Sequence, residues 1–198
     1  MCSSCAVVVV ESKKAAVLNA LAQFGAQVIA EVGRSKSEVK PDSKASINLD
    51  QIDLSLMAVQ KVGPPNEHEV LSVVAGLNVP KPYWELELAM GDGIAGRAAK
   101  IAGRDDSIQF RKFRRGADGS MYNDAYLNFH GDGPQHLWLL SIPLHEKCCD
   151  PMCYGVLNIG AYDRHNADEL DCLNDRSIEV LEKYSNNEFL RAVLNAVG

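Results

Sequence analysis

The feature of this sequence that most constrains its fold is a change in the spacing of its apolar residues. From about residue 12 to residue 33 they recur at steps of three and four, which predicts an amphipathic helix that ends at Gly33. From Ile52 to Ala58 the step becomes two, which is typical of a strand with one buried face. A second strand is expected over 69–75, and the turn residues 63–66 join the two strands into a hairpin.

The second half of the chain contains another pair of expected strands, over 136–144 and 154–160, which also form a hairpin. Between the two hairpins, a short alternating stretch leads into the expected helix Ile94–Ile101. Residues 105–133 are expected to be irregular and are rich in aromatic side chains. An irregular stretch of this length is uncommon inside a compact domain and is often functional.

Both ends of the chain are expected to be helical. The first eleven residues predict either a short strand or the apolar entry to the first helix, and residues 34–50 predict a long polar connection. Near the other end, Asn166 is expected to cap a helix that starts at about residue 167. A break is expected near Ser185, followed by a last helix that reaches about residue 197.

Composition indicates one globular domain that covers residues 1–198. Hydrophobic residues make up 46% and charged residues 23%, and the net charge of −6 argues against nucleic acid or an anionic membrane as the main partner. The longest apolar run, Ala6–Val10, is much shorter than the roughly 20 residues that span a bilayer, and the sequence starts without a basic leader. A cytoplasmic location is therefore expected, and the six cysteines are expected to be reduced there.

The order of these elements defines the fold class as α+β. Consecutive strands joined by tight turns form an antiparallel sheet, and helices at both ends of a chain can pack together on one face of it. The core of the domain is expected to span about residues 50–184, preceded by the helix of about 12–33 and closed by the helices of about 167–197.

Two motifs in this order resemble those of the GAF domain family. The segment Met90–Ala99, with the sequence MGDGIAGRAA, is similar to the G-(E/D)-G-(I/L)-A-G-R motif of that family. The segment Leu140–Leu144, followed by Gly155–Gly160, is similar to its paired strands with the pattern V-P-L and G-V-L-N-x-x-S; Gly160 stands where a serine is common. The resemblance covers about residues 50–184.

The resemblance implies a six-stranded antiparallel sheet with the terminal helices on one face and a ligand pocket on the other. It implies a sensory domain that binds a small molecule, rather than an enzyme, and that forms a homodimer through its terminal helices. The signal would pass to a downstream signalling protein or effector domain. No cofactor or metal is required by this interpretation.

The expected pocket wall is the aromatic and basic segment between the two hairpins. Its side chains combine apolar faces with hydrogen-bond donors, as a small-molecule site requires, and arginines select anionic groups through paired hydrogen bonds. Tyr83 and Trp84 are expected to form a second wall or to bury an edge of the sheet. The expected ligand-binding residues are Tyr83, Trp84, Phe110, Arg111, Phe113, Arg115, Tyr122, Tyr126, His130 and Ser141.

A cluster of cysteines at the tip of the second hairpin supports an alternative function. Cys148, Cys149 and Cys153 follow His145 within nine residues, and thiolates with imidazole suit zinc. The alternatives are a zinc site, a thiol-based redox sensor and a hairpin tip with ordinary thiols. A methionine sulfoxide reductase, which the resemblance also raises, is disfavoured because residues 105–135 contain no cysteine.

Overall fold

The computed structural model describes residues 3–42, 45–62, 68–102, 111–114, 134–145 and 153–186, with the backbone alone for 3–14, 61–62 and 111–114. Six strands form one sheet in the order β3-β2-β1-β6-β5-β4, and all five neighbouring pairs are antiparallel. The elements are, in chain order, α1 (Ser3–Val39), η1 (Leu49–Gln51), β1 (Asp53–Val62), β2 (His68–Leu77), η2 (Lys81–Glu85), β3 (Glu87–Ala89), α2 (Gly93–Ile101), β4 (Arg111–Arg114), β5 (Trp138–His145), β6 (Cys153–Ala161), α3 (Arg164–Leu170) and α4 (Asp175–Tyr184).

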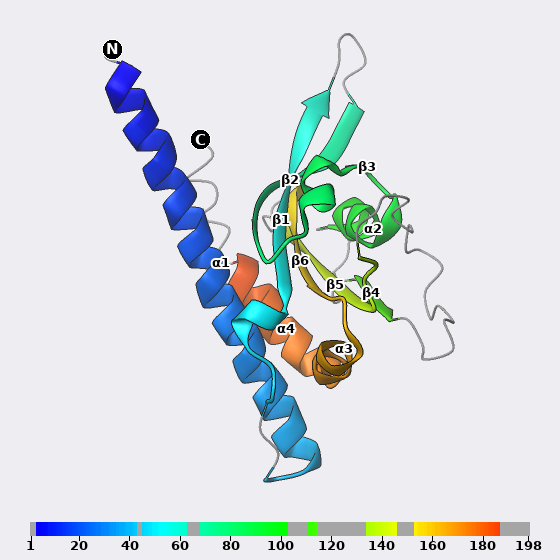
Figure 1. Cartoon of the computed structure of the whole chain (residues 1–198). Helices are drawn as coiled ribbons and strands as arrows, with labels where there is room; N and C mark the ends of the chain where they lie inside the picture. Colours follow the sequence, from blue (N-terminus) through cyan, green and yellow to red (C-terminus); the bar gives the residue numbers. More distant parts are fainter. Residues whose placement is uncertain are drawn as a thin grey trace.

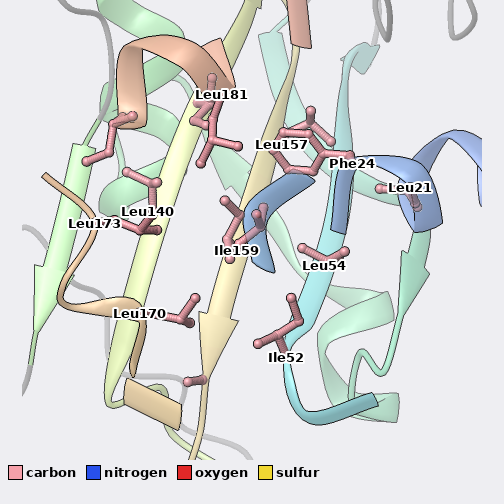
Figure 2. Packing of buried hydrophobic residues seen from close by; sticks show 14 of the residues in the cluster. Leu21, Phe24, Ile52, Leu54, Leu140, Leu157, Ile159, Leu170, Leu173 and Leu181 are labelled. Atoms are coloured by element: carbon pink, nitrogen blue, oxygen red, sulfur yellow. The ribbon is translucent and has the colours of Figure 1, made fainter. Parts of the chain in front are cut away.

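The sheet has helices on both faces, as Figure 1 shows. On one face, α1, α3 and α4 enclose the larger core, which includes Phe24 of α1, Leu181 of α4 and Ile159 of β6 (Figure 2). On the other face, the alanines of α2 pack against Met57 of β1 and Val156 of β6. The sheet order, the antiparallel pairing and the packing of the terminal helices on one face confirm the α+β architecture predicted from the sequence.

Helix α1 lies against the sheet along one buried stripe, which consists of Val17, Leu21, Phe24, Val28 and Val32. Gly25 permits this close approach, because a Cβ atom there would lie 2.2 Å from Cδ1 of Leu49 and 2.8 Å from Cδ1 of Leu54. Residues Ala15–Val39 are long and apolar enough to cross a bilayer by length and composition. One stripe of this helix is buried in the larger core.

The prediction that the first helix ends at Gly33 is wrong. The helix continues to Val39, because its last turns contact the C-terminal helices. Oγ of Ser35 lies 2.7 Å from Oγ of Ser177, and Nζ of Lys36 donates to Oε1 of Glu169 over 2.5 Å. These tertiary contacts outweigh the preference of glycine for a helix end, and they leave a shorter connection than the predicted 34–50.

Three further predictions need correction. Asp163, rather than Asn166, caps α3: its carboxylate accepts a hydrogen bond from the backbone N–H of Asn166 over 2.9 Å. The chain then breaks before α4, which Asn174 caps, so residues 167–184 are two helices and not one. Within the expected irregular segment 105–133, residues 111–114 form the edge strand β4; the rest of that segment, like the helix expected after Ser185, lies outside the described residues.

Candidate functional site

A row of buried polar side chains crosses the face of the sheet that carries α2. Ser55 of β1 pairs with Asn158 of β6, which in turn pairs with Ser141 of β5, so all three residues share one face. Oγ of Ser141 donates to Oδ1 of Asn158 over 2.6 Å, and Nδ2 of Asn158 donates to Oγ of Ser55 over 3.2 Å. All three side chains are buried. The row therefore satisfies its own hydrogen bonds and holds each side chain in one orientation.

A buried carboxylate and an imidazole lie at one end of this row. Nε2 of His136 lies 2.9 Å from Oδ2 of Asp53, and both side chains are almost fully buried. Asp53 pairs with Gly160 across the β1–β6 ladder. A Cβ atom at Gly160 would lie 2.5 Å from Cδ2 and 2.6 Å from Nε2 of His136. The glycine therefore makes room for the imidazole beside the carboxylate.

Two tyrosines complete the cluster around this pair. The ring of Tyr162 stacks on His136 with a centroid distance of 4.3 Å, and its hydroxyl donates to Oδ2 of Asp53 over 2.7 Å. The ring of Tyr83 meets His136 edge-on at 5.1 Å, while its hydroxyl donates to the carbonyl of Pro134 over 2.7 Å. We call Asp53, His136, Tyr83 and Tyr162 the carboxylate cluster. It brings together Tyr83 of η2, Asp53 at the start of β1, and two residues that flank the β5–β6 hairpin in the sequence: His136 just before β5 and Tyr162 just after β6.

The expected ligand-binding residues lie in different parts of the structure. Tyr83 is buried in the carboxylate cluster, whereas its neighbour Trp84 is 42% exposed and donates its indole N–H to the carbonyl of Val79. Ser141 lies in the buried polar row. Arg111 and Phe113 belong to β4, where their backbones pair with Ser141 and Leu139 of β5. Five expected residues lie outside the described part of the chain: Phe110, Arg115, Tyr122, Tyr126 and His130.

The cysteine cluster is only partly within the described structure, since Cys148 and Cys149 lie outside it. His145 and Cys153 pair across the β5–β6 ladder but lie on opposite faces of the sheet, because the ladder is irregular there. Nε2 of His145 lies 3.9 Å from Oε1 of Glu182 in α4. Cys153 instead packs against the smaller cluster that the alanines of α2 form with Met57 and Val156. Burial, aided by the negative charge of Glu69, raises the pKa of the Cys153 thiol to about 11.

A protonated, buried thiol is a poor nucleophile and a poor metal ligand. Within the described ranges, no group of three or more His, Cys, Asp or Glu side chains is arranged to hold a metal ion. The described part of the hairpin therefore does not favour a zinc or redox site that pairs Cys153 with His145.

Sequence reasoning missed Asp53, Ser55, His136 and Tyr162 as members of one site. The alternating pattern of β1 placed Asp53 and Ser55 on a solvent-exposed face, but both faces of β1 are covered. The departure from the family motif at Gly160 was the available signal, because a small residue at the centre of a sheet often marks a close approach by another group.

Solved structures are similar to this chain in fold, and both of those described below are GAF domain structures. No family model and no curated protein matches the chain. One similar structure is described as the structure of the GAF domain; the match has 13% identity and a TM-score of 0.38, and it covers 67% of this chain and 64% of the other. This chain thus spans less than two thirds of that protein.

The second similar structure is described as that of a putative GAF sensor protein from Burkholderia vietnamiensis, with 14% identity and a TM-score of 0.35 over 88% of this chain and 94% of the other. At such TM-scores, neither structure informs on a ligand or partner of this chain. The six-stranded antiparallel sheet, the terminal helices packed on one of its faces and the glycine-rich start of α2 are those that the sequence resemblance implies. The fold of this chain is GAF-like.

Proposed function

We propose that this chain is a small-molecule-binding regulatory domain and that it binds its ligand without turning it over. The ligand lies between the α2-bearing face of the sheet and the segment 105–133. The observation that carries the proposal is the set of buried polar side chains on that face, which consists of Asp53, Ser55, His136, Ser141 and Asn158. A sheet face that serves only for packing is apolar, whereas small-molecule sites combine apolar walls with a few fixed polar groups.

The ligand contacts that we propose come from both sides of this space. Tyr83 belongs to the carboxylate cluster of the sheet side, and the backbones of Arg111 and Phe113 in β4 pair with Ser141 and Leu139 of β5. Ser141 acts through Asn158, since its hydroxyl already donates to that amide. Arg111 and Arg115 would bind an anionic group of the ligand. The remaining proposed contacts are Trp84, Phe110, Tyr122, Tyr126 and His130.

The proposed output passes through the terminal helices to a second copy of the chain. Helices α1 and α4 contact each other on the face of the sheet opposite the polar row, and α1 leans away from the sheet toward its N-terminal end (Figure 1). The same central strands β1 and β6 carry polar residues toward the ligand side and apolar residues toward α1 and α4. A shift of these strands on ligand binding would thus move the dimer helices. We propose a homodimer in the cytoplasm that acts on a downstream signalling protein.

Native mass spectrometry of protein purified from a cytoplasmic source tests this proposal. The expected result is a dimer that carries an organic molecule, which is released when the protein is denatured. The matched control is the variant with Cys148, Cys149 and Cys153 replaced by serine, which should retain the same adduct. A mass increment of one zinc ion per chain without an organic species, lost in the triple variant, would instead support the thiol-based alternative and overturn the proposal.

A further inference from the structure

The carboxylate of Asp53 has one oxygen with two partners and one oxygen with none. Oδ2 accepts hydrogen bonds from the hydroxyl of Tyr162 and lies within hydrogen-bonding distance of His136. Oδ1 is fully buried and has no hydrogen-bond partner among the described residues. Leaving a buried acceptor unpaired costs about 1–3 kcal/mol, and more when the group is charged. The fold therefore retains an acceptor at a position where it costs stability.

The described residues supply little positive charge to this carboxylate. Among the described residues, His136 is its sole ion-pair partner, and no lysine or arginine contacts it. Elsewhere in the described structure a buried carboxylate does have a cation: Glu169 accepts from Lys36. Because a buried carboxylate needs a cation or several donors to offset the loss of water, a positively charged donor is the group that best completes Asp53.

The surroundings of Asp53 also suit a cation. The rings of Tyr83, His136 and Tyr162 lie against one another with centroid distances of 4.3–6.0 Å, and aromatic faces attract cations. Two groups hold Oδ2 and the β1–β6 ladder holds the backbone, so the direction of Oδ1 is fixed before any ligand binds. Tyr162 is half-buried and Pro134 is exposed, so the cluster lies directly beneath the surface of the protein.

We infer that Oδ1 of Asp53 is the anchor for a protonated amine of the ligand. The ammonium group donates a charge-assisted hydrogen bond to Oδ1 beside the aromatic rings of the carboxylate cluster. This inference rests on the proposed function, since it names the chemical class of the ligand for that face of the sheet. A ligand that also carries an anionic group would then satisfy both Asp53 and the proposed contacts Arg111 and Arg115.

The test compares charged and neutral probes of equal shape. Methylammonium, butylammonium and benzylammonium are each titrated at neutral pH against methanol, butanol and benzyl alcohol, and binding is followed by NMR shifts of the full chain. At least one ammonium is expected to bind at least tenfold more tightly than its alcohol. The variant Asp53→Asn should reduce this preference to less than twofold, whereas the exposed control Asp50→Asn, which removes the same charge three residues away, should retain it.

A further variant covers the case in which Asp53→Asn fails to fold. Tyr162→Phe removes one donor from Oδ2 and leaves the charge of Asp53, so it should keep the ammonium preference within about threefold of the parent. Equal binding of each ammonium and its alcohol, or a preference that persists in Asp53→Asn, overturns the inference and indicates that Oδ1 is satisfied by water only. Failure of all three ammonium probes to bind overturns it as well. In each of these cases an organic adduct in native mass spectrometry would leave the proposed function standing.

Discussion

Replacing Gly160 with alanine tests how much the close approach of His136 to Asp53 contributes to stability. In an unconstrained strand position this substitution stabilises a protein by about 0.5–1 kcal/mol, because glycine loses more backbone entropy on folding. Here the new methyl group would lie 2.5 Å from Cδ2 of His136 and 3.3 Å from Oδ2 of Asp53. The imidazole is bounded by Tyr83 and Tyr162, so it can move aside only by leaving the carboxylate.

The expected cost follows from these contacts. A hydrogen bond to a charged group contributes about 1.5–3 kcal/mol, and the entropic gain of alanine offsets part of its loss. The net destabilisation of Gly160→Ala is therefore about 1–2 kcal/mol, which for a chain of this size lowers Tm by about 2–8 °C. Urea unfolding followed by tryptophan fluorescence measures it, provided that the transition is two-state.

The matched control is Gly33→Ala in α1. Among the described residues, a Cβ atom at Gly33 would meet only atoms of Ala45, at 3.9 Å, and the position lies inside the helix. This variant should gain about 0.5–1 kcal/mol, since alanine is the better helix former. A Gly160→Ala protein as stable as the parent would refute the argument that the glycine makes room for His136. A destabilised Gly33→Ala protein would refute the continuation of α1 to Val39.

Two further predictions concern titratable groups. Burial acts to raise the pKa of Glu169, but hydrogen bonds from Lys36 and Ser46 outweigh it and hold that pKa below its usual value of 4.5. The resulting stabilisation is present above pH 4.5 and is lost as the pH falls through the folded-state pKa. Lys36→Gln should therefore lower the free energy of unfolding by about 1 kcal/mol at pH 7. The difference in this free energy between the variant and the parent should shrink below pH 4.5. A difference that does not depend on pH would contradict the pairing of Lys36 with Glu169. The second prediction concerns Cys153, whose thiol pKa rises from 9.0 to about 11 in the folded protein. Iodoacetamide should therefore modify Cys153 about 100-fold more slowly in the native protein than in urea. Peptide mapping that finds equal rates would show that the thiol is not buried.

The spacing of apolar residues predicted most of the fold because it records which side of an element meets the core. The steps of three and four identified the stripe of α1 from Val17 to Val32, and the alternation identified the two hairpins. Motif resemblance identified the glycine-rich start of α2. All of these are local patterns, and each persists in the structure.

The errors came from contacts between distant parts of the chain. The end of α1 depends on Glu169 and Ser177, which lie more than 130 residues away from Lys36 and Ser35. The four-residue strand β4 is too short to show a period and forms because β5 offers a free edge. In β1, Asp53 has the polar character of an exposed position, and only the tertiary structure shows that it is buried. No local pattern in the sequence contains such information.

The central position of the β1–β6 pair has a consequence for how this chain is synthesised. Asp53 and Gly160 lie opposite each other in the β1–β6 ladder, although more than 100 residues separate them along the chain. Ribosomes add about 5–20 residues per second, so β1 and the apolar stripe of α1 emerge several seconds before β6 can cover them. During that interval the nascent chain presents an unpaired strand edge beside an unburied helix face, which is the kind of surface that chaperones bind and that aggregates. The architecture therefore makes cellular production of this domain sensitive to translation speed and to chaperone supply, more than a sheet of sequential hairpins would be.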